Sequence, residues 1–506
     1  MSPTLAERLA DYAQQLRFED LPAEVVHEVK RRLIDSFACA LGALGADAPT
    51  IAARVARRVT AQPAATLIAG GTSSADLATF ANGVLVRYLD FNDTYLSKEP
   101  AHPSDNLPAV LAAAEVAGRG GKDVICAAVL AYEVQCRLCD AASIRARGWD
   151  HVTYGSFSTA LAAAKLFGCD HRKLVHALGL AGVDGIALRQ TRAGELSMWK
   201  GCAFANSARN GVFAAMLAAD GMTGPAPILE GVFGFEKLVS GPLDLPRLGG
   251  FPLPRGEGQG EGSNSEGQTP QPVAGQMPSP QPSPRGRGGE ATASSATNPK
   301  MPDTTREPFM ILRTYIKYWP AEYHSQSAID AALQLRPETG SVDSIERIDI
   351  ESFDAAVDII ASDPEKWRPK TRETADHSLP YCVAVALADG EVGHDQFVPA
   401  RFQDEALLDL VARIRVHRDA ALTARYPAGI PNRLRVRLKD GRELVCEVEF
   451  PRGHARNPMS DQEVEAKFHS LASADLTAEQ RDELLRRVWK LEEQRNVSSI
   501  VELLAS

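Results

Sequence analysis

A long segment rich in glycine and proline divides this chain of 506 residues into two parts. Between Gly249 and Glu290, 11 Gly and 8 Pro make up 19 of 42 residues. Such a composition buries too little apolar surface to offset the conformational entropy that is lost on ordering. We therefore predict a disordered insertion over 248–304, with a folded region on each side. A proline-rich ligand for a partner domain is the alternative interpretation of this segment, on composition alone.

The part before the insertion has the pattern of successive helices. Thr4 and Glu7 form a capping box, after which apolar residues recur at helical spacing. Alanine-rich segments follow at 107–118, 123–139, 157–167 and 203–219. Small residues at helical spacing allow helices to pack closely. We predict an all-helical domain over 1–247.

The part after the insertion mixes strands with helices. Residues 344–352 alternate between apolar and polar, as in a strand. Residues 433–438 and 444–450 alternate likewise on either side of Asp440-Gly441, which is a strong hairpin signal. We predict an α+β lid domain over 305–455.

The last 50 residues return to a helical pattern, with a second capping box at Thr477 and Gln480. We expect the segment 456–506 to pack back on the first domain. The predicted fold class is therefore mainly α: a large all-helical domain formed from both chain ends plus a smaller α+β lid domain.

Charge and composition exclude several classes of function. Lys and Arg number 55 against 65 Asp and Glu, a formal charge of -10, so we expect neither nucleic acid nor membrane as a partner. The N-terminus lacks the apolar core of a signal peptide, and no apolar run is long enough to span a membrane. We expect a cytoplasmic protein with reduced thiols.

The cysteines do not predict a metal site. Cys136 and Cys139 have the CxxC spacing, but they lie in a helical context and no second pair accompanies them. No group of three cysteines suggests an iron–sulfur cluster, and no phosphate-binding or serine-hydrolase motif is present. We expect no metal and no cofactor.

Two segments of the helical part contain polar groups that are costly to bury. Asp90 and Thr94 are four residues apart, a spacing that would place them on one face of a helix, and His102 lies between two prolines in a non-helical loop. His151 precedes an alanine-rich helix. These residues are candidates for a site. The alternative is that they are loop and helix-capping residues of structural importance only.

Three further polar segments are candidates for the same site. Lys200 enters a helix of small residues, where a pocket and a surface position are equally compatible with the sequence. Lys317 and His324 lie among aromatic residues and could form a cationic wall of a cleft between the domains. The alternative is that these aromatic residues only pack at the interface between the two domains. The polar segment 371–381 is interpreted as holding the cleft in shape.

Together these segments resemble the MmgE/PrpD family, in particular its branch of 2-methylcitrate dehydratases. The resemblance covers about 1–246 and 305–506, and four motifs carry it. They are LDFNDT at 89–94, HPSDN at 102–106, KYWPAEYHSQSA at 317–328 and TRETADHSLPY at 371–381. The resemblance implies a helical domain built from both chain ends, a smaller lid, a homodimer, and metal-free chemistry on small polycarboxylates.

The resemblance also implies the site residues and the reaction. We expect catalytic roles for Asp90, His102, His151 and Lys200, and substrate-binding roles for Thr94, Lys317 and His324. The general acid and the general base are not distinguished among Asp90, His102 and His151. The implied reaction removes water from 2-methylcitrate to give cis-2-methylaconitate, with citrate and cis-aconitate as further substrates. The alternatives are a cis-aconitate decarboxylase or another polycarboxylate lyase or isomerase of the family, and a non-enzymatic polycarboxylate-binding protein.

Overall fold

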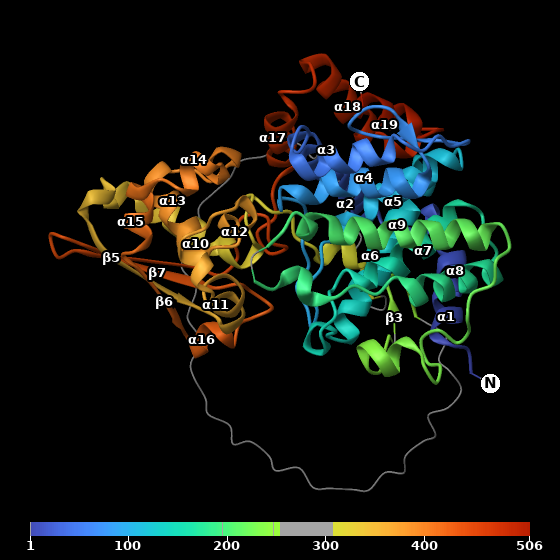
Figure 1. Cartoon of the computed structure of the whole chain (residues 1–506), viewed down its shortest axis with the longest axis horizontal. Helices are drawn as coiled ribbons and strands as arrows, with labels where there is room; N and C mark the ends of the chain where they lie inside the picture. The colour runs from blue at the N-terminus through green and yellow to red at the C-terminus, as the bar shows by residue number, and fades with distance from the viewer. Residues whose placement is uncertain (1, 195, 246, 253–306, 506) are drawn as a thin grey trace, which may run out of the picture.

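The computed structural model describes residues 2–194, 196–245, 247–252 and 307–505. These residues form two lobes of unequal size, which Figure 1 shows side by side. α-Helices predominate among the elements, and the largest sheet has four strands. The predicted mainly α fold class is confirmed.

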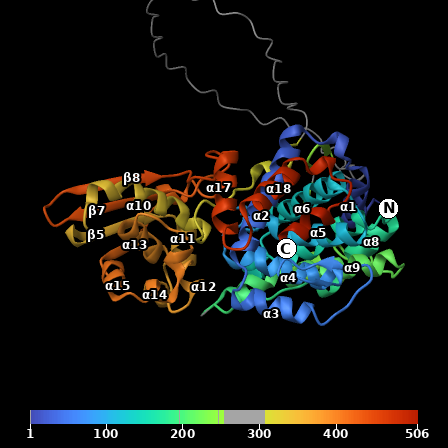
Figure 2. The same ribbon diagram turned by 90° about the horizontal axis from the view of Figure 1, so that it is seen from above.

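The larger lobe contains helices from both ends of the chain (Figures 1 and 2). They are α1 (Leu5–Gln15), α2 (Ala23–Gly42), α3 (Asp47–Ala56), α4 (Ala75–Tyr88), α5 (Leu107–Val116), α6 (Gly121–Ala141), α7 (Thr153–Leu166), α8 (His171–Asp184), α9 (Trp199–Ala219), α17 (Asp461–Ala472), α18 (Ala478–Trp489) and α19 (Ser498–Leu504). Both predicted capping boxes are confirmed, before α1 and before α18. One hydrophobic core runs through these helices apart from α3, whose buried alanines pack in a smaller cluster with residues of α4 and α9.

Small residues allow the central helices of this lobe to pack closely around α9. A Cβ atom added at Gly83 of α4 would lie 2.9 Å from the Cβ of Ala205 of α9, and one at Gly155 of α7 would lie 2.6 Å from the ring of Phe204. Cβ atoms essentially never approach other atoms this closely, so a side chain at either position would force the helices apart. α9 is therefore held in direct contact with both α4 and α7.

The C-terminal helices pack directly on the N-terminal ones. Lys30 of α2 donates hydrogen bonds to the Trp489 carbonyl and to Glu492, each at 2.8 Å. A Cβ atom at Gly121 would lie 1.6 Å from the Leu491 carbonyl oxygen, so the tail meets the backbone at the start of α6 with no side chain between them. The tail is thus part of the larger lobe's core.

The smaller lobe contains a four-stranded sheet in the order β6–β5–β7–β8. Its strands are β5 (Ile345–Ser352), β6 (Ile414–Arg418), β7 (Asn432–Leu438) and β8 (Glu443–Val448). β5 is parallel to β6 and antiparallel to β7. The predicted hairpin of β7 and β8 is confirmed, and its turn contains Gly441 at a φ of 91°, a conformation that glycine adopts without steric cost.

The two faces of this sheet differ in character. Ile350, Leu434 and Val436 are fully buried in a second hydrophobic core, together with residues of α10 (Gln326–Thr339) and α13 (Leu379–Asp389). The residues that alternate with them form ion pairs, such as Arg433 with Glu351 at 2.5 Å and Arg435 with Glu351 at 2.8 Å. Alternation along each strand therefore separates the core from the solvent face. The remaining helices of this lobe are short: α11 (Asp354–Ile360), α12 (Arg372–Ala375), α14 (Pro399–Phe402), α15 (Glu405–Val411) and α16 (Ala420–Thr423).

Two pairs of very short strands lie in the larger lobe. β1 (Ala65–Thr66) pairs with β2 (Thr72–Ser73), and β3 (Arg247–Leu248) pairs with β4 (Phe251–Pro252). The insertion predicted over 248–304 lies outside the described residues, apart from residues 248–252.

No single described helix combines the length and the apolar character that a membrane span requires. α2 and α3 meet both criteria only when taken together, and they are bent by 97° relative to each other.

A buried lysine connects the tail to the centre of the molecule. The Nζ atom of Lys467 in α17 lies 2.6 Å from a carboxylate oxygen of Asp35 in α2. It also donates hydrogen bonds to the Phe91 carbonyl at 2.7 Å and to the Lys317 carbonyl at 2.9 Å. One ammonium group therefore joins four segments that are distant in the sequence.

We expect the substitution Lys467→Met to lower the free energy of unfolding by about 3–5 kcal/mol, because it leaves the Asp35 carboxylate buried without its partner. Urea denaturation followed by circular dichroism measures this change. The control is Lys490→Met, which removes an exposed pair with Glu493 at 3.9 Å and is expected to cost no more than about 0.5 kcal/mol. Equal effects of the two substitutions would contradict the structural role of Lys467.

Candidate functional site

A cavity of about 260 Å³ lies between the two lobes and is lined by residues of both. All seven site residues predicted from the sequence are part of its wall. They are Asp90, Thr94, His102, His151 and Lys200 of the larger lobe, Lys317 of the segment between the lobes, and His324 of the smaller lobe. The fold brings these residues together from widely separated positions, and their roles are proposed below.

The turn after α4 places Asp90 in the cavity wall. Asp90 has a φ of 52°, the one positive value among the described residues other than glycine. Such a conformation is strained for a residue with a side chain and persists where the surroundings enforce it. Here cationic side chains donate hydrogen bonds to four consecutive backbone carbonyl groups. Arg372 donates to the carbonyls of residues 88 and 89 at 3.0 and 3.1 Å, Lys317 to that of Asp90 at 2.8 Å, and Lys467 to that of residue 91 at 2.7 Å.

Thr94 reaches the cavity in a different way from the one predicted. α4 ends at Tyr88, and residues 89–94 are not helical. Thr94 instead forms an isolated β-bridge with Tyr315, with two backbone hydrogen bonds of 2.8 Å. The prediction that Asp90 and Thr94 share a helix face is therefore wrong, because the turn at Asp90 redirects the chain. Both side chains nevertheless line the cavity.

The Asp90 carboxylate is surrounded by cations. One oxygen accepts hydrogen bonds from Arg87 and, at 2.7 Å, from Lys317, and the other accepts from Lys200 at 3.2 Å. Burial alone raises the pKa of this carboxyl group, but the charges of Arg87, Lys200 and Lys317 outweigh burial and hold the pKa well below its usual range. Asp90 is therefore a carboxylate of low basicity whose chief effect is to neutralise neighbouring cations.

Asp93, three residues further on, points away from the cavity. Its carboxylate accepts hydrogen bonds from the Ser104 backbone at 2.8 Å and from the Tyr132 hydroxyl at 2.7 Å. Asp93 is completely buried and is not part of the cavity wall. Of the two carboxylates in the LDFNDT motif, one therefore faces the site and the other fixes the HPSDN loop.

Three histidines of the cavity wall share one arrangement, in which the Nδ1 atom contacts a carboxylate. They are His151 with Asp150 at 2.8 Å, His324 with Glu322 at 2.7 Å, and His377 with Asp376 at 2.5 Å. The carboxylate favours a hydrogen on Nδ1 and leaves Nε2 as the nitrogen with a free electron pair. His377 is the exception as a base, because burial, followed by the charge of Lys200, lowers its pKa below the usual value. The geometry of His151 with Asp150 and of His324 with Glu322 is suited to a base.

His102 differs from these three histidines. Its Nδ1 lies 2.7 Å from the carbonyl oxygen of Asp93, which can only accept, so the hydrogen is on Nδ1. Its Nε2 accepts from Arg87 at 3.0 Å. Burial, followed by the charges of Arg87 and Lys317, lowers the pKa of His102 well below its usual value. His102 is therefore a neutral hydrogen-bond acceptor that orients Arg87.

The cavity wall is positively charged although the chain is acidic. Seven cationic side chains and four carboxylates line the cavity. The cations are Arg87, Arg145, Arg189, Arg192, Lys200, Lys317 and Lys366, and the carboxylates are Asp90, Glu322, Asp358 and Asp363. Asp150 and Asp376, which pair with Arg192 and Lys200, add two carboxylates next to the wall. The balance is then +1 with histidine neutral, against -10 for the whole chain. Among the described residues, none forms a salt bridge with Arg145, Arg189 or Lys366. This cavity is suited to bind an anion with several negative charges.

Sequence reasoning missed several of these residues. Asp150 and Asp376 each directly precede a histidine of the wall, and this repeated Asp-His pair is a signal that was available. Arg87 lies one helical turn before Asp90, which is also a recognisable spacing. Arg145, Arg189 and Lys366 lie in or next to short 3-10 turns whose positions no periodic pattern predicts.

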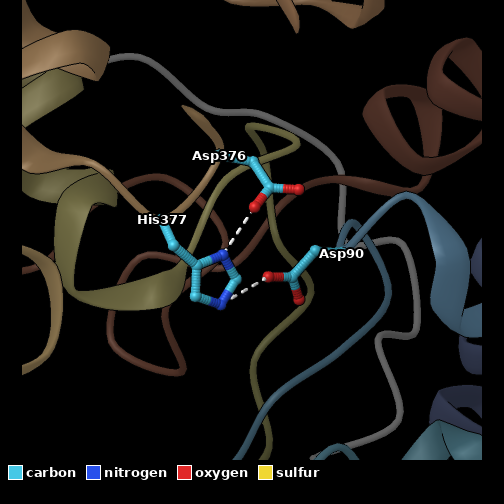
Figure 3. Close-up of side chains that lie close together, drawn as sticks. All are labelled: Asp90, Asp376 and His377. Atoms are coloured by element: carbon cyan, nitrogen blue, oxygen red, sulfur yellow. Dashed lines mark hydrogen bonds and ion pairs between the residues drawn. The ribbon is translucent and has the colours of Figure 1, made fainter. Parts of the chain in front are cut away.

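One group of described side chains has the composition of a metal site. Figure 3 shows Asp90, Asp376 and His377, whose oxygen and nitrogen atoms all lie within 4.8 Å of one another. His377 lies between the two carboxylates, with Nδ1 toward Asp376 and Nε2 3.4 Å from Asp90. Lys200 and Lys317 already contact this group, so its carboxylates are balanced by the chain's own cations.

Comparison with known proteins identifies the family of the chain. The MmgE/PrpD N-terminal domain matches residues 7–247, and the MmgE/PrpD C-terminal domain matches residues 319–491. The 2-methylcitrate dehydratase of Cupriavidus necator is 28% identical over 486 residues, covering 88% of this chain and 86% of the relative. That of Escherichia coli K12 is 26% identical over 412 residues, covering 75% and 71%. A cis-aconitate decarboxylase-like protein of Aspergillus oryzae is 25% identical over 517 residues, covering 98% and 96%. With both domains matched in order and along most of its length, the chain belongs to the MmgE/PrpD family.

Proposed function

We propose that this chain is a hydro-lyase that removes water from 2-methylcitrate to give cis-2-methylaconitate, without a metal ion or another cofactor. The observation that carries the proposal is the cationic cavity between the lobes, in whose wall Arg145, Arg189 and Lys366 have no carboxylate partner among the described residues. Relatives named 2-methylcitrate dehydratase, at 25–28% identity, support this choice of substrate. Citrate and cis-aconitate have the same three carboxylates and are further candidate substrates.

The cations without carboxylate partners provide places for the substrate. Arg145 and Arg189 are half-buried and Lys366 is buried, and all three line the cavity. Each substrate carboxylate that pairs with one of them compensates a charge that the protein leaves uncompensated. His324 of the smaller lobe and the Thr94 hydroxyl, which donates to the Ala101 carbonyl at 3.1 Å and retains free electron pairs, are proposed as hydrogen-bonding partners.

Elimination requires a base for a C–H bond next to a carboxylate. We assign the base to His151, because Asp150 contacts its Nδ1 and Nε2 is left to accept the proton. Arg192, whose Nε lies 3.0 Å from Asp150, holds that carboxylate in place. Asp90 and His102 are less suitable, since cations lower the proton affinity of both. In this assignment Asp90 and His102 position Lys200 and Arg87.

The leaving hydroxyl group requires a proton, and we assign this proton to the Lys200 ammonium. Burial lowers the pKa of Lys200, which makes its ammonium a stronger acid than that of an ordinary lysine. The C–H electron pair becomes the C=C bond, the C–O bond breaks, and the hydroxyl leaves as water with the lysine proton. The positive wall stabilises the charge that develops on the substrate carboxylate as the proton departs.

The reaction can be followed by NMR of the purified chain with 2-methylcitrate in heavy water. We expect the signals of 2-methylcitrate to be replaced by those of cis-2-methylaconitate, and the rate to stay unchanged after treatment with EDTA. Loss of activity on chelation would contradict the metal-free mechanism. Release of carbon dioxide from cis-aconitate would favour a decarboxylase, the alternative suggested by the relative from Aspergillus oryzae. Tight binding of tricarboxylates with no turnover would favour a binding protein.

We expect His151→Gln and Asp150→Asn each to lower kcat by about 10²–10⁴-fold, the usual contribution of a general base. Steady-state kinetics with 2-methylcitrate measures this effect. A matched control is His417→Gln, since His417 also pairs with a carboxylate, Asp349 at 3.0 Å, but on the surface of the smaller lobe. Unchanged turnover in both His151 and Asp150 variants would rule out this base.

We also propose that the chain is a homodimer. Large apolar side chains are exposed on α9 and next to it, among them Phe213 at 50%, Met198 at 46% and Val183 at 51%. Contact with a second copy of the chain would remove this apolar surface from water. Light scattering after gel filtration should give twice the chain mass of 54.5 kDa, and Phe213→Asp should shift the protein toward the monomer. A wild-type protein that is monomeric at micromolar concentration would be incompatible with this proposal.

A further inference from the structure

The ammonium group of Lys200 lies between two carboxylates and beside an imidazole. Its Nζ atom is 3.2 Å from Oδ2 of Asp90 and 3.5 Å from Oδ1 of Asp376. It is also 3.3 Å from Nδ1 of His377, whose hydrogen is directed to Asp376. These are the three side chains of Figure 3, whose donor atoms lie within 4.8 Å of one another. Asp90, Asp376 and Lys200 are at most 2% exposed, so water contributes little to holding the charge.

Two carboxylates and an imidazole are a donor set that commonly binds a divalent cation. Here the chain supplies its own cation at that place. A divalent ion would have to displace the Lys200 ammonium and to approach Lys317, which is 2.7 Å from Asp90. The arrangement therefore favours a single charge that is covalently attached to the protein over a dissociable ion.

The donors come from both lobes. Asp90 and Lys200 belong to the larger lobe, at the end of α4 and the start of α9. Asp376 and His377 belong to the smaller lobe and lie between α12 and α13. The same segment contains Arg372, which bonds the carbonyls at the end of α4. Docking of this segment on the larger lobe thus completes the surroundings of Lys200 and supports the Asp90 turn at once.

We infer that Asp376 is a positioning residue of the smaller lobe that, with Asp90, holds the Lys200 ammonium in a cage of two carboxylates, and that His377 orients Asp376 through the hydrogen on its Nδ1. The surroundings of the Lys200 ammonium are then complete only when the lobes are docked. This inference deepens the proposed function, on which the acid role of Lys200 rests. The cage is defined by contacts and charge and does not depend on catalysis. It can therefore be tested by measuring ligand binding as well as turnover.

The cage has a consequence for the proton on Lys200. Burial lowers the pKa of Lys200, whereas the charges of Asp376 and Asp90 raise it. The other charged or titratable groups that face it are Arg87, Arg192 and His377. Removing the charge of Asp376 should therefore lower the pKa of Lys200 further. The site would then lose its ammonium at a lower pH.

The test compares Asp376→Asn with wild type in the full chain. We expect the alkaline limb of the kcat/KM profile for 2-methylcitrate to move to lower pH by about 1–3 units, the usual effect of one nearby charge. Calorimetry with tricarballylate, a tricarboxylate that lacks the hydroxyl group, should show the same shift in binding. The control is Asp389→Asn, which removes a carboxylate of the same lobe that pairs with Arg401 and is not part of the cavity wall. Its alkaline limb is expected to match that of wild type. Equal alkaline limbs for wild type and both variants would overturn the cage.

A second variant tests the cage without the charge of Lys200. Lys200→Ala leaves both carboxylates in place, so methylammonium should restore tricarballylate binding in a saturable manner, and less effectively in Lys200→Ala/Asp376→Asn. No restoration by methylammonium in the correctly folded Lys200→Ala variant would overturn the inference. If wild type binds tricarballylate with the expected pH dependence but turns over no tricarboxylate, the proposed function fails while the cage stands.

Discussion

The turn that follows α4 depends on positive charges supplied by three distant parts of the chain. Four consecutive carbonyl groups, at residues 88–91, accept hydrogen bonds from Arg372 of the smaller lobe, Lys317 of the connecting segment and Lys467 of the C-terminal tail. The last carbonyls of a helix have no partners within it, and burying them without partners is costly. These cations meet that requirement. They also hold Asp90 in a backbone conformation that a residue with a side chain rarely adopts.

Because of this constraint, the position of Asp90 in the site depends on contacts from distant parts of the fold. The tail helix α17 contributes to the site although it does not line the cavity, because Lys467 fixes the chain on either side of it. The smaller lobe contributes Arg372 at the turn and, in the cavity wall, His324, Lys366 and His377. We propose that separation of the two cores, which are joined by charged contacts, gives the substrate a route into the buried site.

The balance of charge in the cavity follows from the same contacts. An acidic chain keeps a positive hollow by burying lysines and arginines beside carboxylates that do not fully compensate them. Buried charges of this kind seldom maximise stability, since removing them from water is expensive. We propose that they are instead oriented in advance for an anion, and that a bound tri-anion stabilises the docked lobes.

Much of this could be predicted from the sequence, and the remainder has physical reasons. Periodicity and caps predicted the helices, and alternation around Asp440-Gly441 predicted the hairpin, because those signals are local. The candidate residues were identified as polar groups in places where burial needs a reason. The turn at Asp90 was misjudged, since its conformation depends on Arg372 and Lys467, which lie hundreds of residues away. Arg145 and Arg189 gave no signal for the same reason: only the fold directs them to the cavity.

The central claim is that the cavity between the lobes binds a tri-anion at its cationic wall. A crystal structure of the chain with bound tricarballylate tests it most directly. We expect the ligand between the lobes, with its carboxylates on Arg145, Arg189 or Lys366 and its carbon chain beside Nε2 of His151. A ligand bound elsewhere, or a cavity left empty at saturating tricarballylate while the lobes are docked, would contradict it.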